Sequence, residues 1–254
     1  FSVWELLKCV TVASGNDAAV ALAEHLSGSE EAFVARMNQR AAQLGMADTH
    51  FLNCTGLPAA GHLTSAYDIA LMSRQLILDH PAVREFTTIW MDSFRDGTFG
   101  LTNTNRLVRF YNGATGLKTG STSSAGCCIS ATAERDGMEL IAVILKAPTS
   151  PQRFEDAKAL LDYGFASCAL AAVYPDAPLS PIPVVLGESA QVQPVLQRDC
   201  RLLVARGEKG QITTRVTLPD DLEAPVEQDQ LLGQMEVYVG DELRDTVPIL
   251  AGQP

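Results

Sequence analysis

Apolar residues recur at the spacing of a helix over much of the first two thirds of the chain. The apolar segment 2–12 is typical of a helix that ends at a turn around Ser14. Glycine and proline punctuate residues 46–63, which are therefore expected to form a loop. Four further helices are predicted. The first covers 18–26 with Asn16 and Asp17 as caps, and the second runs from a capping box at 27–30 to Gly45. The third runs from the cap Thr64 to Pro81, and the fourth from Ser150 to Gly164.

A period of two replaces the helical period from Thr87 onward. It predicts strands over 87–92, 117–133 and 138–146. The tripeptide Arg135-Asp136-Gly137 lies between the last two strands and is typical of a hairpin turn. Residues 95–114 are polar and rich in asparagine and glycine, so we expect them to form a surface segment.

A change in composition marks a domain boundary. Four prolines fall between Pro175 and Pro183, where we predict a linker. Short β-rich segments follow at the spacing of a small sandwich or barrel, over 182–186, 190–195, 200–205, 211–218, 233–239 and 244–249. The fold class is therefore α+β, with one domain over 1–174, a Pro-rich linker over 175–183 and a β-rich domain over 184–254.

Composition narrows the classes of function. The 254 residues carry a net charge of −11, which disfavours binding to the anionic backbone of nucleic acids. No run approaches the roughly 18 apolar residues of a membrane span. The six cysteines include no C-x-x-C pair, so a metal site is not expected. The histidines are scattered without metal-ligand spacing and are interpreted as core or surface residues: His25, His50, His62 and His80.

Two tripeptides carry the candidate chemistry. Ser14-Gly15-Asn16 precedes a helix, and Lys118-Thr119-Gly120 opens an alternating strand. Acyl transfer needs a nucleophile, a proton shuttle and donors for an oxyanion. The Ser14 hydroxyl can project into a cleft, and the Asn16 amide can hold a substrate carbonyl. The Lys118 ammonium can attract a carboxylate and lower the pKa of neighbouring proton donors.

The strand after Lys118 offers the remaining groups. Gly120 lets a substrate backbone approach the strand edge, as when a peptide ligand adds to a sheet. The N–H of Ser121 is well placed to donate to an oxyanion. Each tripeptide also has a plainer interpretation, since Ser14 can cap a helix and Lys118 can be a solvated residue at a strand end. Their order along the chain favours the catalytic interpretation.

Longer stretches extend this pattern: Ser14-Gly15-Asn16-Asp17-Ala18, His50-Phe51-Leu52-Asn53, Thr64-Ser65-Ala66-Tyr67-Asp68, Gly116-Leu117-Lys118-Thr119-Gly120-Ser121-Thr122 and Leu160-Leu161-Asp162-Tyr163-Gly164-Phe165. With them, residues 1–168 resemble the serine-type D-Ala-D-Ala carboxypeptidases, the low-molecular-mass penicillin-binding proteins of peptidase family S11. The β-rich tail resembles the family's C-terminal domain more loosely. The resemblance implies a β-lactamase/transpeptidase-like catalytic domain, an antiparallel sheet with helices that is incomplete at its N-terminus.

The resemblance also implies a role for each residue of the two tripeptides. Ser14 would assist proton relay, and Asn16 would contact the substrate. Lys118 and Thr119, with Gly120 beside them, would bind the terminal carboxylate of a D-Ala-D-Ala stem peptide of peptidoglycan. The enzyme would release the terminal D-alanine through a serine acyl-enzyme, with the Ser121 N–H in the oxyanion hole.

Further expectations rest on the same resemblance. Arg153 would support the carboxylate-binding side of the site, and a salt bridge at the start of a helix is an equally good interpretation of it. The family needs no metal or cofactor, is inhibited by penicillins and acts outside the bacterial cytoplasm, secreted or in the cell envelope. Members often associate with the membrane through a C-terminal amphipathic anchor. Residues 240–254 show none, so we expect an anchor either to lie beyond Pro254 or to be absent.

One motif of the family is missing from the sequence. Its nucleophile lies in Ser-x-x-Lys, and no serine here is followed by a lysine three residues later. We therefore expect an N-terminal truncation, with that motif upstream of Phe1. Removing the helix that carries the motif would expose several hundred Å² of the apolar face of 2–44, which costs about 10 kcal/mol at ~25 cal/mol per Å². Residues 1–254 alone are then expected to be unstable or inactive.

Other functions fit parts of the pattern. A β-lactamase or a transpeptidase would use the same chemistry. Class A β-lactamases have a similar order of motifs, although their second motif is normally Ser-Asp-Asn and they lack a β-rich tail. A non-catalytic peptidoglycan-binding protein would bind the stem peptide without being acylated by penicillin. A structural or interaction module would rest on the β-rich tail alone.

Overall fold

The computed structural model describes residues 1–94 and 97–252. The chain divides into two compact units, Phe1–Phe165 and Ala166–Pro254. The division lies N-terminal to the proline-rich segment 175–183, because β6 (Cys168–Val173) already pairs with β10 (Cys200–Ala205) of the second unit. In the described part of the chain, every helix is too short or too polar to cross a bilayer.

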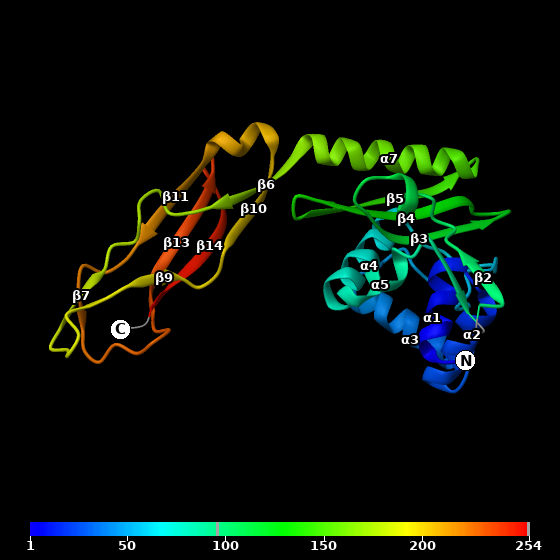
Figure 1. The fold of residues 1–254 in the computed structure, drawn as a ribbon, viewed down its shortest axis with the longest axis horizontal. Coiled ribbons are helices and arrows are strands. Elements are labelled where there is room, and N and C mark those ends of the chain that lie inside the picture. Colours follow the sequence, from blue (N-terminus) through cyan, green and yellow to red (C-terminus); the bar gives the residue numbers. More distant parts are fainter. Residues whose placement is uncertain (95–96, 253–254) are drawn as a thin grey trace. The chain divides into compact units, whose positions relative to one another are not determined.

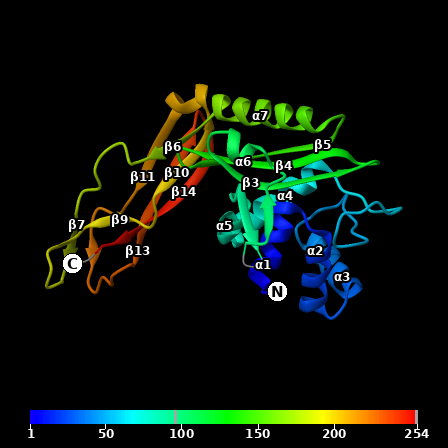
Figure 2. The ribbon, with the colours of Figure 1, turned by 45° about the vertical axis from the view of Figure 1, so that its right-hand side comes forward.

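The first unit is built around a three-stranded antiparallel sheet in the order β3-β4-β5. The strands are β3 (Ala114–Thr122), β4 (Gly126–Arg135) and β5 (Met138–Ala147). Helix α7 (Ser150–Ser167) lies along one face of this sheet, and α4 (Ala66–Asp79) lies along the other (Figure 1, Figure 2). The predicted α+β fold with an antiparallel sheet is confirmed.

Smaller elements complete the helical side of the first unit. They are α1 (Val3–Lys8), a π-helical turn (Cys9–Ala13), α2 (Asn16–Ser27), α3 (Glu30–Gln43), a 3₁₀ turn (Pro81–Val83), α5 (Arg84–Thr87), β1 (Met91–Phe94), β2 (Phe99–Thr102) and α6 (Leu107–Phe110). The predicted loop over 46–63 is present, closed at its ends by a bridge between His50 and Leu63.

Three helix starts differ from prediction, and side-chain hydrogen bonds account for two of them. α2 begins at Asn16 itself, with Gly15 as its N-cap. Ser65, and not Thr64, caps α4, because the Thr64 hydroxyl pairs with another hydroxyl in the preceding loop. The predicted capping box at 27–30 is wrong. Ser27 ends α2, and Ser29 caps α3 by accepting the Ala32 N–H at 3.1 Å.

Residues 117–133 form two strands of a hairpin where the alternation predicts one. The chain turns over 123–125, where the Ala125 N–H donates to the Thr122 hydroxyl at 2.9 Å. Gly126 then adopts φ +67°, which favours glycine. Alternation alone cannot reveal this turn, because small polar residues continue through it. The turn predicted at 135–137 is confirmed, with Asp136 and Gly137 both at positive φ.

The segment 95–114 is not simply a surface segment, as far as its described residues 97–114 show. It contains β2 and α6, and Leu101, Asn103, Asn105 and Leu107 are all buried. The two asparagines tolerate burial because their amides find backbone partners. Asn103 donates to Ile89 O at 2.7 Å, and Asn105 donates to Gly116 O at 2.8 Å. The preceding strand, predicted over 87–92, starts only at Met91.

Helix α7 packs its apolar stripe onto the sheet. Phe154, Ala157, Leu161 and Phe165 are buried, whereas Leu160, predicted to face inward, is half exposed. Gly164 allows the close approach, since a Cβ there would lie 2.6 Å from Leu140 of β5. The helix thereby fixes its own first turn, which carries Arg153, against the sheet.

The second unit is a small sandwich, in agreement with the predicted β-rich domain. One sheet has the order β11-β13-β14-β9, and β6 pairs with β10 opposite it. Met235, Val237, Val247 and Ile249 of the larger sheet pack with Leu202 and Val204 of β10 in one core. The remaining elements are β7 (Ile182–Val185), β8 (Gln191–Val192), β9 (Pro194–Leu196), a 3₁₀ turn (Arg206–Gln211), β11 (Ile212–Thr217), β12 (Leu222–Glu223), β13 (Leu231–Val239) and β14 (Glu242–Ala251).

Gly116 sets the contact between α5 and the strand that carries Lys118. Its φ is +151°, and a Cβ would lie 2.8 Å from the buried Thr87. We predict that Gly116→Ala lowers the free energy of unfolding by about 2 kcal/mol, from backbone strain and this clash. Denaturant titration followed by circular dichroism measures the loss. Gly100→Ala is the matched control, because a Cβ at Gly100 meets nothing within 4 Å. An equal effect of the two changes would contradict the prediction.

Candidate active site

Ser14 lies at the junction of two helical segments. The π-helical turn ends there, and Ser14 adopts the left-handed conformation with φ 60° and ψ 41°. The Gly15 N–H returns to Cys9 O at 3.0 Å, and α2 begins at the next residue. Val12, two residues earlier, is completely buried. The turn is therefore anchored in the core while the Ser14 side chain stays exposed.

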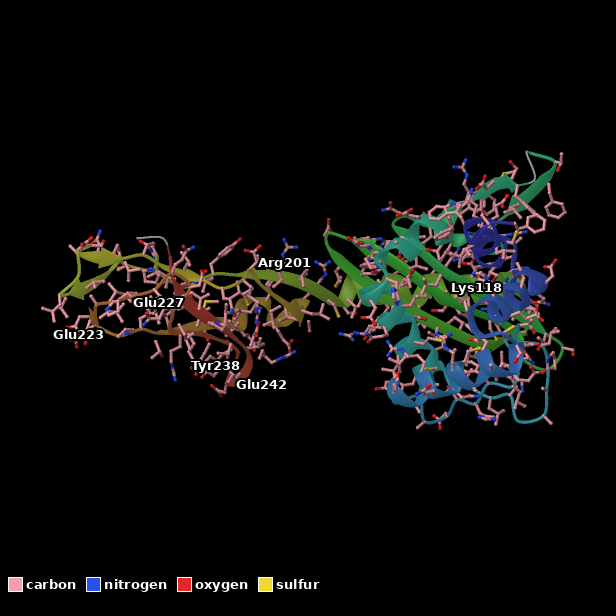
Figure 3. The ribbon with its side chains drawn as sticks, turned by 90° about the horizontal axis from the view of Figure 1, so that it is seen from below. Lys118, Arg201, Glu223, Glu227, Tyr238 and Glu242 are labelled. Carbon is pink, nitrogen blue, oxygen red and sulfur yellow. The ribbon has the colours of Figure 1, made fainter. Side chains whose placement is uncertain are left out.

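Lys118 reaches Ser14 from the sheet. It lies on β3 opposite Ser130 of β4. Figure 3 labels Lys118 within the first unit. Its ammonium donates to Ser14 Oγ at 2.8 Å and to the carbonyl of Thr119 at 2.7 Å. The structure thus brings together the two tripeptides that the sequence identified. Their contact also ties the N-terminal helices to β3.

The Lys118 ammonium is poorly solvated. Burial lowers the pKa of Lys118 to about 8 from an ordinary value of 10.5, and repulsion by Arg153 adds to this effect. Among the described residues, Lys118 forms no ion pair with a carboxylate. The site therefore holds a cation that can exchange a proton near neutral pH and that lacks an acidic partner.

Thr119 and Gly120 continue the same strand. Thr119 is buried, and its hydroxyl shares a hydrogen bond of 2.6 Å with Thr104. Thr104 is itself held by its N–H, which donates to Val12 O at 3.1 Å. A Cβ at Gly120 would meet nothing within 4 Å. Neither a steric clash nor a left-handed φ therefore requires glycine at position 120. Because Gly120 has no side chain, the surface of β3 is open to a ligand at this point.

Arg153 supports the end of this strand from α7. Its Nη1 donates to Gly120 O and Ser121 Oγ, both at 3.1 Å, and to Cys128 O at 3.3 Å. Its Nε is buried and has no hydrogen-bond partner among the residues that the structure describes. Burial lowers the pKa of Arg153, and Arg106 adds a smaller repulsion. The alternative role in a salt bridge is not observed in the described part of the chain.

A cavity of about 610 Å³ joins these groups. Ser14, Asn16, Lys118, Gly120 and Ser121 all line it, as does Thr119. Residues 53–57 and His62, from the loop between α3 and α4, line it as well. Arg153 lies behind the strand and does not line the cavity.

The sequence does not predict that the loop between α3 and α4 forms part of the cavity wall. Its residues carry no recognised catalytic pattern, and His62 was interpreted only as a core or surface histidine. The turn signals Asn53 and Gly56 were the available clue, because loops placed by a rigid scaffold often carry binding residues. No cluster of metal-binding side chains occurs within residues 1–94 and 97–252.

Comparison with known proteins identifies the family. The D-alanyl-D-alanine carboxypeptidases of peptidase family S11 match residues 1–149, and the C-terminal domain of penicillin-binding protein 5 matches residues 173–254. The chain belongs to the D-alanyl-D-alanine carboxypeptidase family. It is 36% identical to the carboxypeptidase DacF of Bacillus subtilis and 32% identical to DacC of Escherichia coli, each over 98% of this chain. It spans only 65% and 62% of the lengths of these two carboxypeptidases.

Solved structures of penicillin-binding proteins share the fold. A peptidoglycan synthesis regulatory factor (PBP3) from Streptococcus pneumoniae superposes with a TM-score of 0.78 and 28% identity, over all of this chain and 77% of that one. Penicillin-binding protein 5 from Haemophilus influenzae gives 0.73 and 29%, over 99% of this chain and 74% of that one. Penicillin-binding protein D2 from Listeria monocytogenes, solved with cefotaxime and with ampicillin, is 38% identical with a TM-score of 0.61, over 65% of this chain and up to 68% of that one.

The family assignment leaves the role of each residue as a prediction. For Ser14, Asn16, Lys118, Thr119, Gly120 and Ser121 the structure provides proximity around one cavity. For Arg153 it provides contacts to the strand that lines that cavity.

The low pKa of Lys118 has a measurable consequence. Between pH 8 and 10.5 the folded chain has released this proton while the unfolded chain still holds it, so Lys118 makes the free energy of unfolding rise with pH across this window. We predict that Lys118→Met removes this rise. Urea titrations of both proteins from pH 7 to 10.5 measure the difference. Parallel stability profiles for the two proteins would show that Lys118 titrates normally.

Proposed function

We propose that the chain forms the substrate-binding and proton-relay part of a D-alanyl-D-alanine carboxypeptidase. The observation that carries this proposal is the hydrogen bond between Lys118 Nζ and Ser14 Oγ at the wall of one cavity. This bond links the exchangeable proton of the Lys118 ammonium to the Ser14 hydroxyl, which lines the cavity. The substrate is a peptidoglycan stem peptide that ends in D-Ala-D-Ala, and the product is the peptide without its terminal D-alanine.

Charge supports a ligand that ends in a carboxylate. Lys118 and Arg153 lie close enough for repulsion between them to lower the pKa of Lys118. Neither has an acidic partner among the described residues, although the whole chain has a net charge of −11. An anionic ligand would relieve this repulsion. The exposed Asn16 amide is available for a backbone carbonyl of the same ligand.

The proton follows a short path in this proposal. When a nucleophilic serine attacks the peptide carbonyl, its hydroxyl proton must reach the nitrogen of the departing D-alanine. Ser14 can accept a proton on its oxygen and donate its own, and Lys118 holds the Ser14 oxygen in place. The Ser121 N–H is proposed as a donor to the oxyanion that forms during attack.

The acylating serine is proposed to lie outside residues 1–254. No Ser-x-x-Lys occurs in this sequence, whereas the carboxypeptidases it matches are longer. β-Lactams are proposed to enter the same cavity, since the neighbour from Listeria was solved with cefotaxime and with ampicillin. By its family, the enzyme is proposed to act on the outside of a bacterial cell.

Acylation by a fluorescent penicillin tests the proposal. We predict no labelling of the 254-residue chain, and covalent labelling of the same chain joined to its own Ser-x-x-Lys segment. Fluorescence of the denatured protein on a gel measures the bond. In the labelled form, Lys118→Ala should slow acylation by about 100-fold, because proton transfer by a positioned group contributes about 10²–10⁴-fold.

Two results would contradict the proposal. Labelling of the 254-residue chain alone would place the nucleophile within it. Absence of labelling from the joined form, although it is folded by circular dichroism and binds N-acetyl-L-lysyl-D-alanyl-D-alanine, would identify a peptidoglycan-binding protein without the acyl-enzyme step. Rapid release of hydrolysed penicillin would instead indicate a β-lactamase.

A further inference from the structure

His62 is the one histidine that lines the catalytic cavity within the described part of the chain. It lies in the loop between α3 and α4, far in sequence from both tripeptides. The proton relay proposed above does not use it. Its position beside Asn53 and Leu57 places an imidazole on a wall of the cavity that β3 does not form.

One hydrogen bond of His62 indicates which ring nitrogen carries the proton. Nδ1 accepts the Leu52 N–H at 3.4 Å, so this nitrogen carries no proton in the neutral ring. The proton therefore resides on Nε2, which has no hydrogen-bond partner among the described residues. The ring also packs edge-to-face on Phe51, with a centroid separation of 5.9 Å. These contacts leave the Nε2–H as the polar end of the ring.

The surroundings of the His62 imidazole favour its neutral form. Burial lowers the pKa of His62 below its ordinary value of 6.5, and repulsion by His50 of the same loop adds to the shift. A neutral imidazole with Nδ1 engaged acts as a single hydrogen-bond donor. Its natural partner is a carbonyl oxygen, which a peptide supplies along its backbone.

The loop that holds His62 is anchored at several points. Asn38 of α3 both donates to and accepts from the backbone of Phe51, at 2.8 Å each. The buried carboxylate of Asp68 accepts the Asp48 N–H at 2.9 Å and the Thr49 hydroxyl at 2.7 Å. These contacts fix the loop before any ligand arrives, so a donor on it is pre-organised.

We propose that the Nε2–H of His62 donates a hydrogen bond to a backbone carbonyl of the bound stem peptide. This inference rests on the proposed function. It makes His62 a substrate-binding residue that positions the peptide from the loop between α3 and α4, while the carboxylate end binds at β3. His62 takes no part in the proton relay.

Binding of N-acetyl-L-lysyl-D-alanyl-D-alanine to the 254-residue chain, measured by isothermal titration calorimetry at pH 7.5, tests the proposal. His62→Phe keeps the ring against Phe51 and removes the donor, and it should weaken binding by about three- to tenfold, the value of one hydrogen bond. His62→Gln places an amide N–H near the position of Nε2 and should restore most of the affinity. His50→Phe is the matched control, because His50 belongs to the same loop but does not line the cavity.

A spectroscopic measurement separates direct contact from a structural effect. In protein labelled with ¹⁵N-histidine, the Nε2 resonance of His62 should shift on addition of the peptide while Nδ1 keeps its unprotonated position. Equal affinities for His62→Phe and the unaltered chain, with loss of binding in Lys118→Ala, would overturn this inference and leave the proposed function intact. No binding by the unaltered, folded chain would contradict both.

Discussion

The hydrogen bond from Lys118 to Ser14 is the contact on which the site depends. It joins residues that are 104 positions apart, one on a strand and one at a helical turn. Ser14 is held in a left-handed turn above the buried Val12, and Lys118 is held by its pairing with β4. A single short contact between two rigid supports gives a more exact geometry than a contact between loops.

Hydrogen bonds from residues 103–105 hold the segment before α6 against β3 and against the end of α5. The Asn103 amide donates to the backbone carbonyl of Ile89 and the Asn105 amide to that of Gly116, while Thr104 between them pairs with Thr119. Asn103, Asn105 and Thr119 are buried, and an unsatisfied buried polar group costs about 1–3 kcal/mol, so these bonds favour one arrangement of the segment. On the other side of the strand, Arg153 bonds three oxygens at once.

The sequence predicts much of this arrangement, and the failures have local causes. The two tripeptides, the hairpin turn at 135–137 and the position of α7 follow from short-range rules of turns and periodicity. The burial of Asn103 and Asn105 does not, because their partners, Ile89 and Gly116, come from distant segments. Helix starts were misassigned where neighbouring hydroxyl residues competed, as at Thr64 and Ser65. The loop wall of the cavity was missed because its positions depend on anchors in α3 and α4, such as Asn38 and Asp68.

Lys118 and Arg153 are two cations near β3, and burial lowers the pKa of each. The consequence differs, because only the pKa of Lys118 comes near neutral pH. Burial brings the pKa of Lys118 to about 8, so a substantial share of its ammonium groups is deprotonated at mildly alkaline pH. A guanidinium has a far higher starting pKa and stays charged even when burial lowers it. Arg153 can therefore maintain a positive potential along the strand while Lys118 gains or loses a proton. Were both residues lysines, the repulsion that lowers one pKa would act on the other as well, and the site would lose its attraction for an anion as it gained a base.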